Sequence, residues 1–408
     1  EISTRDWSSD VCSSDLAISW RLMDEGFIQN LKLFSDLRMR LSYGIVGNDG
    51  VAPYGTQANL INTAYDFDGS PAFGFAPANI SNTDLRWEKS KEINLGINMG
   101  FFQDRVAASV EIYKRNTVDL ILNQRLPTST GFDVVTSNVG EVLNQGIEVT
   151  LNTLNVKRGD FTWSTTLNFS TNRNEILELY GDGITEDKGN ALFVGHSLKS
   201  NFYFEFDGIW QLDQADQANV YGQKPGSVRV VDQNGDGRIS TSDAIDDRVV
   251  LGNQLPTWLA GMRNQVNFKN WDLSFFVYTR QGVQFRNTML SGTMGELGSD
   301  RYNRLNLNYW TTTNPTNDYF GVAVPNPYRQ AIQYQDASFI RISDITLGYT
   351  FSRTLLDRLG VSNARIYGQV TNPFVFSNFD GLDPEYNSGT FQDDVPAAIY
   401  LMGISLSF

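Results

Sequence analysis

The sequence predicts an all-β protein, and among all-β folds it favours an antiparallel transmembrane β-barrel with long extracellular loops. Apolar and polar residues alternate over stretches of about ten residues, as expected for strands whose two faces meet different surroundings. No run approaches the roughly 18 apolar residues of a membrane helix. Short polar turns join some of the stretches, whereas loops rich in Asn, Gly and Asp separate others.

The alternating stretches follow one another along most of the chain. Within 147–152 the odd-numbered residues are apolar and the even-numbered ones polar, and 161–169 shows the same period. Short turns are expected at Gln103-Asp104 and at Lys269-Asn270. We expect strands at 35–46, 91–102, 105–116, 142–154, 161–172, 257–267, 270–281, 339–351, 364–372 and 398–408, with 198–210 less distinct. The long loops are 47–90, 211–256 and 282–338.

A soluble β-sandwich or propeller would also alternate, so the period alone does not decide the architecture. Loops of several tens of residues are uncommon in compact soluble domains. The last stretch alternates up to the final residue, Phe408. Aromatic residues near strand ends suit the two interfacial girdles of a membrane barrel. These residues are Tyr43, Phe101, Phe102, Trp163, Trp258, Trp271, Tyr349 and Tyr400.

Composition excludes several classes of function. The chain has 32 Lys and Arg against 46 Asp and Glu, a net charge of −14, which disfavours nucleic-acid binding because phosphate contacts need clustered cations. It has one His and one Cys. This scarcity argues against Cys- or His-rich zinc sites, haem motifs and disulfide scaffolds. It also leaves little material for Ser-His or Cys-His catalysis, so we expect no enzyme and no catalytic residues.

The N-terminal 1–16 forms a segment of its own. It is rich in Ser and Asp and has no strand or helix period. Its run from Arg5 to Leu16 resembles a peptide produced when sequencing-adapter DNA is translated into an assembled gene. We therefore expect 1–16 to be non-native, so that Cys12 carries no information on redox compartment and a targeting segment would not be visible.

Five segments in this order resemble the SusC/RagA family of TonB-dependent outer-membrane transporters. LRWEKS at 85–90 leads into EINLG at 92–96, and the strand from Arg105 to Tyr113 exits at Asp119-Leu120. NVGE and NQGIE follow at 138–141 and 144–148, and SFIRI and ITLGY at 338–342 and 345–349. NPF at 372–374 and GLDPE at 381–385 complete the series.

The resemblance implies that 17–408 is the C-terminal part of a TonB-dependent receptor barrel, without the plug and the early strands. The expected fold is then a partial barrel, roughly ten to twelve strands of a larger one. The implied function is import of oligosaccharides or peptides across the cell outer membrane. The implied partners are a SusD-like surface lipoprotein, the TonB complex acting through the missing plug, and outer-membrane lipid.

A calcium-type loop lies at 232–243, where DQNGDGRISTSD fits the twelve-residue D-x-N-x-D-G pattern. Side-chain oxygens would come from the first, third and fifth positions, and Gly237 permits the sharp turn. The final position is Asp rather than Glu. Because the Asp side chain is shorter, we expect weaker Ca²⁺ binding. An Asp/Asn/Gly-rich turn without metal is the alternative. The expected ligands are Asp232, Asn234, Asp236, Arg238 through its carbonyl, Ser240 and Asp243.

The directions of the expected strands predict on which side of the membrane the calcium-type loop lies. If the chain ends in the periplasm and the 103–104 turn is periplasmic, an even number of spanning strands must lie between 161–172 and 257–267. We therefore expect 198–210 not to span the membrane, and 173–256 to form one extracellular excursion that the calcium loop stiffens.

Other features support rival functions less well. His196 is expected to be a loop residue, and the adjacent side chains of Asp246 and Asp247 should diverge rather than form a glycosidase acid pair. Loop aromatics could stack on sugars or simply pack the loops. These are Tyr54, Tyr65, Tyr302, Tyr309, Trp310 and Tyr319. The rival functions are a secreted calcium-stabilised β-sandwich adhesin or lectin and a β-rich glycoside hydrolase.

Overall fold

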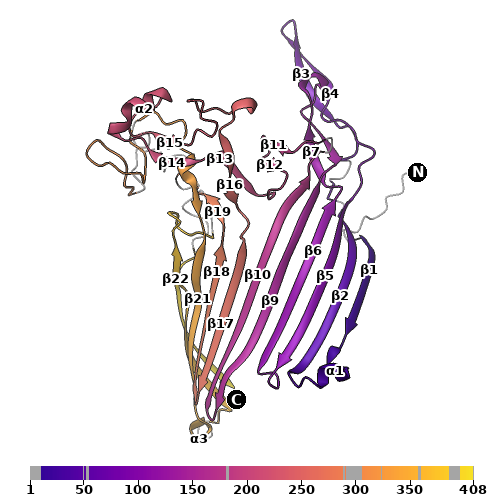
Figure 1. The fold of residues 1–408 in the computed structure, drawn as a ribbon, viewed down its shortest axis with the longest axis vertical. Helices are drawn as coiled ribbons and strands as arrows, with labels where there is room; N and C mark the ends of the chain where they lie inside the picture. Colours follow the sequence, from indigo (N-terminus) through magenta and orange to yellow (C-terminus); the bar gives the residue numbers. More distant parts are fainter. Residues whose placement is uncertain are drawn as a thin grey trace. The chain divides into compact units, whose positions relative to one another are not determined.

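The computed structural model describes residues 11–48, 50–51, 55–180, 183–287, 290, 306–322, 324–356, 360–385 and 396–407. Within them, eleven strands form one antiparallel sheet in the order β1-β2-β5-β6-β9-β10-β17-β18-β21-β22-β23 (Figure 1). Their bounds are β1 Val11–Trp20, β2 Phe34–Asn48, β5 Glu88–Phe101, β6 Val106–Val118, β9 Glu141–Arg158, β10 Phe161–Glu178, β17 Trp258–Phe268, β18 Trp271–Gln281, β21 Phe339–Thr350, β22 Asn363–Ser377 and β23 Ile399–Ser407.

The remaining elements are short and lie between these strands. The hairpins and paired segments are β3 Leu60–Phe67 with β4 Ser70–Pro77, β7 Ile121–Arg125 with β8 Val134–Asn138, β11 Glu186–Asp187 with β12 Leu192–Phe193, β13 Ser200–Phe204 with β16 Arg248–Asn253, β14 Phe206–Ile209 with β15 Val228–Val230, and β19 Gln284–Arg286 with β20 Tyr334–Asp336. The helices are α1 Gly26–Gln29, α2 Ala215–Val220 and α3 Arg353–Leu356, and single 3-10 turns are η1 Leu22–Asp24, η2 Thr128–Thr130, η3 Leu212–Gln214, η4 Asp243–Ile245 and η7 Ala331–Gln333. No helix in this part of the chain is long and apolar enough to cross a membrane.

Every strand predicted for the sheet is present. β9 and β10 extend beyond the predicted 142–154 and 161–172 because main-chain pairing continues past the alternating residues. Both predicted tight turns are present, at 102–105 and at 269–270, and Phe102, Gln103, Asp104 and Lys269 adopt positive φ there. The predicted end of the last strand at Phe408 lies outside the described residues, and β23 ends at Ser407.

The absence of a strand signal in 1–16 is a wrong prediction for its last six residues. β1 begins at Val11 and pairs with β2 from Val11↔Gly47 to Trp20↔Met39. Main-chain hydrogen bonds form whatever the side chains are, so a strand at the edge of a sheet needs no apolar period. The foreign origin of 1–16 stays a prediction.

Contacts divide the chain into two compact units, each built on part of the sheet. The first comprises Glu1–Asp104, Ala108–Glu148 and Asn172–Leu198, and the second comprises Arg105–Ala107, Val149–Thr171 and Lys199–Phe408. In the first unit Val142, Ile176, Leu179 and Tyr180 form a small core with Leu120, Leu122, Val139, Leu192 and Val194 packed against it.

The second unit has its core in its loops rather than in its sheet. Buried residues from 204–230 pack against residues from 290–332, so the two long loops fold together into one compact cap. The buried members are Phe204, Ile209, Val228, Val230, Leu290, Trp310, Tyr319, Phe320, Ala331 and Ile332. β13, within the predicted 198–210 stretch, pairs only with β16 and takes no part in the large sheet, which confirms that this stretch does not span with the others.

Candidate functional site

The sheet has one apolar and one polar face in each unit, and the polar face carries the candidate site. In β18 the odd-numbered Trp271, Leu273, Phe275 and Val277 alternate with Asp272 and Ser274. On the apolar face large side chains stay exposed, with Trp271 at 50%, Leu347 at 49% and Ile404 at 68%. A soluble protein rarely exposes apolar rows of this extent, whereas a barrel in lipid requires them.

In the first unit a polar hollow of about 340 Å³ opens on β5, β6, β9 and β10. Arg115 Nε donates to Glu92 Oε2 at 2.6 Å, and Tyr113 Oη donates to Asn172 Oδ1 at 3.1 Å. Glu111 on the hollow's rim accepts from Arg40 Nη2 at 2.9 Å. The other lining residues are Asn94, Asn144 and Glu148. Amides, carboxylates and one guanidinium suit a hydroxyl-rich or amide-rich ligand better than an apolar one.

In the second unit the polar face of the sheet holds three Arg–Asp ion pairs that differ in burial. Arg365 bonds Asp272 at 3.0 and 2.5 Å, and Arg263 lies 3.4 Å from Asp344, with all four side chains partly exposed. The third pair is buried, and joins Arg341 of β21 to the loop after β22.

The buried pair joins the GLDPE segment to strand β21 of the sheet. Arg341 Nη2 donates to Asp383 Oδ1 at 2.6 Å and Oδ2 at 2.7 Å, and both side chains are only 4% exposed. Glu385 Oε2 lies 3.6 Å from the same guanidinium and also accepts a hydrogen bond from Tyr278. Arg341 Nε is buried without a hydrogen-bond partner, so the network is not fully satisfied. Both segments stand out in the sequence, but no local pattern indicates a contact between residues 42 positions apart.

The NVGE segment is also a scaffold. Asn138 Nδ2 donates to the carbonyls of Arg86 and Asp119 at 2.7 and 2.9 Å, which ties the LRW run to the exit of β6. Gly140 has φ +91°, and a Cβ there would lie 2.9 Å from the carbonyl oxygen of Glu178. Only glycine tolerates both the positive φ and the lack of space for a Cβ. Asn138 and Gly140 therefore shape the main chain at the end of the sheet.

Two of the loop aromatics pack the cap instead of facing a ligand. Trp310 is 6% exposed and donates from Nε1 to Gln211 at 2.9 Å, and Tyr319 is 2% exposed. Tyr65 and Tyr309 remain exposed, at 66% and 39%. Tyr54 and Tyr302 lie outside the described residues. The packing interpretation is therefore the correct one for Trp310 and Tyr319.

The predicted calcium loop lies on the cap and is held by its own side chains. Asp232 accepts from the amides of Gly235 at 2.7 Å and Gly237 at 2.8 Å. Asn234 accepts from the Asp236 amide, and Asp236 accepts from the Arg238 amide, both at 2.8 Å. Ser240 Oγ accepts from the Ser242 amide at 3.0 Å. Ile239 packs on the cap core, and strand β15 precedes the loop.

Hydrogen bonds in the loop favour the charged form of the Asp232 carboxylate. Burial acts to raise the pKa of Asp232, but the amides of Gly237 and Gly235 and the Tyr221 hydroxyl outweigh it and lower that pKa. Burial and the Asp232 charge raise the pKa of Tyr221. The side chain of Asp243 lies outside the described residues. Across the residues that are described, no three His, Cys, Asp or Glu side chains gather as a metal cluster.

Asp247 is a structural residue that sequence reasoning missed. It is fully buried, and its oxygens accept from the amides of Gln233 at 3.0 Å and Ser240 at 2.8 Å, which joins the two arms of the calcium-type loop. Asp246 instead bonds Arg248 at 3.0 and 2.9 Å, so the two adjacent side chains diverge as predicted. His196 is an exposed loop residue beside Phe193, again as predicted.

Comparison with known proteins fits this two-faced sheet. The family model described as "TonB dependent receptor-like, beta-barrel" matches residues 3–372. TonB-dependent receptor P26 of Formosa agariphila is 32% identical over 421 residues, covering 96% of this chain and 42% of the relative. TonB-dependent receptor SusC of Bacteroides thetaiotaomicron is 28% identical over 408 residues, covering 96% and 40%.

Solved structures agree. The RagAB peptide importer in its open-open state superposes with a TM-score of 0.77 at 25% identity, covering 97% of this chain and 42% of that one. The chain thus spans about two-fifths of the length of the relatives it matches. The chain belongs to the family of TonB-dependent outer-membrane receptors, as a SusC/RagA-like portion of their transmembrane β-barrel.

Proposed function

We propose that this chain forms barrel wall and extracellular loops of an importer that takes oligosaccharides, or alternatively peptides, across the outer membrane. The observation that carries the proposal is the alignment of nearly the whole chain with SusC and with the RagAB peptide importer. A polar face with a hollow of about 340 Å³ supports it, since such a face can line a wet passage. In this proposal the barrel wall catalyses no reaction.

The proposal includes two partners. A SusD-like surface lipoprotein would close over the loops, and the TonB complex would supply energy through a plug region that is not among these residues. Both follow from the SusC and RagAB likeness. The adhesin, lectin and glycoside hydrolase alternatives gain no support, because the family model and the relatives are receptors.

An uptake experiment tests the function and separates the two substrate classes. Cells that lack the gene are complemented with wild type or with Glu111→Gln/Arg115→Gln, and labelled oligosaccharides and labelled peptides are supplied separately. We expect wild type to restore uptake of the oligosaccharides and the double variant to reduce it several-fold. Lys114→Gln, an exposed charge next to Arg115, is the control. Restored uptake of peptides alone would reverse the substrate class, and no restored uptake of either would refute import.

We also propose that the loop at 232–243 binds Ca²⁺. Asp232, Asn234 and Asp236 would give side-chain oxygens, Arg238 its carbonyl, and Ser240 and Asp243 the rest. The depressed pKa of Asp232 and the Asx-type bonds of the first three residues support a charged, preformed loop. Calcium would supply only a structural clamp on the extracellular cap. Calorimetric titration with Ca²⁺ tests this, with Asp236→Ala as the variant that should lose the heat of binding.

A further inference from the structure

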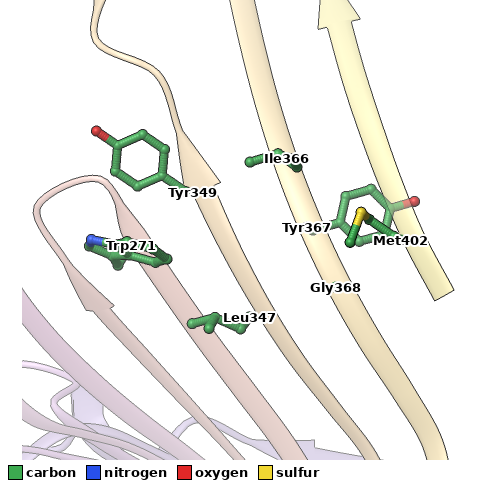
Figure 2. A pocket seen from close by; sticks show the side chains of 7 residues that line it. All are labelled: Trp271, Leu347, Tyr349, Ile366, Tyr367, Gly368 and Met402. Carbon is green, nitrogen blue, oxygen red and sulfur yellow. The ribbon is translucent and has the colours of Figure 1, made fainter. Parts of the chain in front are cut away.

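A groove runs along the apolar face at the tight-turn end of the second unit. It measures about 270 Å³ and is lined almost entirely by apolar atoms. Figure 2 shows its walls, which come from β18, β21, β22 and β23. The residues that shape it are Trp271, Leu347, Tyr349, Ile366, Gly368 and Met402.

A missing side chain makes the groove. Leu347, Gly368 and Met402 are consecutive partners across β21, β22 and β23, so Gly368 leaves a gap between two long side chains. A Cβ at Gly368 would meet only the Leu401 carbonyl oxygen, at 4.0 Å. The position therefore has room for a side chain that the sequence does not supply.

The groove opens toward lipid rather than toward the polar face. Met402 is 81% exposed and Leu347 49%, and both belong to the apolar rows of their strands. Trp271 and Tyr349 close the end nearest the turn, with ring centroids 4.8 Å apart. The groove is slightly smaller than the about 300–1,000 Å³ of pockets for drug-sized ligands, so it can take a segment of one hydrocarbon chain.

A cation lies at the same end of the groove. Lys269 Nζ lies 5.6 Å from the ring centroid of Phe268, and Phe268 is the cross-strand partner of Trp271. Phe268 is 50% exposed on the apolar face, so the ammonium is held on the lipid side at the rim. An apolar slot that ends at aromatic rings and a cation matches an acyl chain with a phosphate at its head.

We propose that this groove binds one acyl chain of a membrane phospholipid, with the phosphate on Lys269. Short turns of outer-membrane barrels are periplasmic, so the lipid belongs to the periplasmic leaflet. A lipid in the periplasmic leaflet cannot be lipopolysaccharide, which lies in the opposite leaflet, or the acyl chain of a surface lipoprotein. The inference depends on the outer-membrane placement of the sheet and not on import.

The test counts phospholipids that stay bound to the protein. The full chain is extracted from outer membranes with mild detergent, and retained lipid is identified by native mass spectrometry. Gly368→Leu fills the gap, and we expect it to lower retention at least ten-fold. Gly368→Ala adds only the Cβ that fits, and should retain lipid. Ala260→Leu ends in the same side chain as Gly368→Leu but places it in the apolar row of β17 outside the groove, and should also retain lipid.

Lys269→Gln provides an independent arm because it changes only a turn side chain. We expect it to lower retention several-fold, and to do so even if Gly368→Leu fails to fold. Equal retention in wild type and both Gly368→Leu and Lys269→Gln would overturn the site. Equal loss in Ala260→Leu would show a general effect on lipid contact, and retained lipopolysaccharide in place of phospholipid would reverse the leaflet. Either result would also contradict the proposal.

Discussion

The buried ion pair between Arg341 and Asp383 gives the most informative perturbation of this wall. Asp383→Ala removes both short hydrogen bonds and leaves a guanidinium that is 4% exposed. Losing one partner of a buried pair costs about 3–5 kcal/mol, because the remaining charge is desolvated. Glu385 at 3.6 Å still offsets part of that charge, so we expect the low end, about 3 kcal/mol.

The assay is urea unfolding of the chain reconstituted in lipid vesicles, which reports the free energy of unfolding. Asp272→Ala is the matched control, since it breaks a two-bond Arg pair whose side chains are 30% and 28% exposed. Partly exposed pairs contribute about 0–1 kcal/mol, so this variant should lose no more than that. The double variant Arg341→Met/Asp383→Leu should regain most of the stability, because no buried guanidinium is then left unpaired and only the bond from the Glu385 amide to Asp383 is lost.

Two results would refute this reasoning. One is a loss below about 1 kcal/mol in Asp383→Ala, which would mean that the guanidinium reaches water. The other is a double variant as unstable as Asp383→Ala, which would assign the cost to packing of the loop rather than to an unpaired charge.

Three further predictions concern the loops. Adding 10 mM Ca²⁺ should stabilise the cap by about 1.4 kcal/mol if the dissociation constant is about 1 mM, and Asp236→Ala should abolish this gain in a thermal melt. Trp310→Ala should destabilise the cap by about 3–5 kcal/mol and open it to proteolysis while the sheet keeps its circular dichroism, because a buried indole and its bond to Gln211 are lost. Burial and the hydrogen bond to Asp187 raise the pKa of Tyr180 to about 12, so its stabilising contribution is complete below about pH 10 and is lost between there and about pH 12. Tyr180→Phe should remove that alkaline loss, measured as stability against pH.

Each of these has a contrary outcome. Equal Ca²⁺ stabilisation of wild type and Asp236→Ala would place the ion elsewhere. A protease pattern unchanged in Trp310→Ala would mean that the cap does not depend on its core. An alkaline loss that persists in Tyr180→Phe would assign it to another titrating group.

The strands were predictable because their side chains meet two different surroundings, which imposes a period of two on the sequence. The hairpin of β3 and β4 was missed, although Asp68-Gly69 with φ of 53° and 79° is the turn that joins such strands. That signal was available within the predicted 47–90 loop. β1 was missed because edge pairing depends on the main chain.

The candidate site was less predictable because it depends on contacts between distant residues. Trp310 and Gln211 meet across 99 residues, and no local pattern distinguishes a packed loop aromatic from one that faces a ligand. Asp247 was noticed only as one of an adjacent acid pair, whereas its role comes from amides on both arms of a loop. The calcium-type motif was visible because its spacing is local.

Spin labels at two adjacent positions of β21 test most directly which face of the sheet meets lipid. Nitroxides are attached at Thr346→Cys and Leu347→Cys in membranes, and collision rates with dissolved oxygen and with a water-soluble nickel chelate are compared. We predict that the label at Leu347 collides mainly with oxygen, which concentrates in lipid, and the label at Thr346 mainly with the chelate. Equal accessibility at both positions, or the reverse order, would contradict a barrel wall with its apolar row toward lipid.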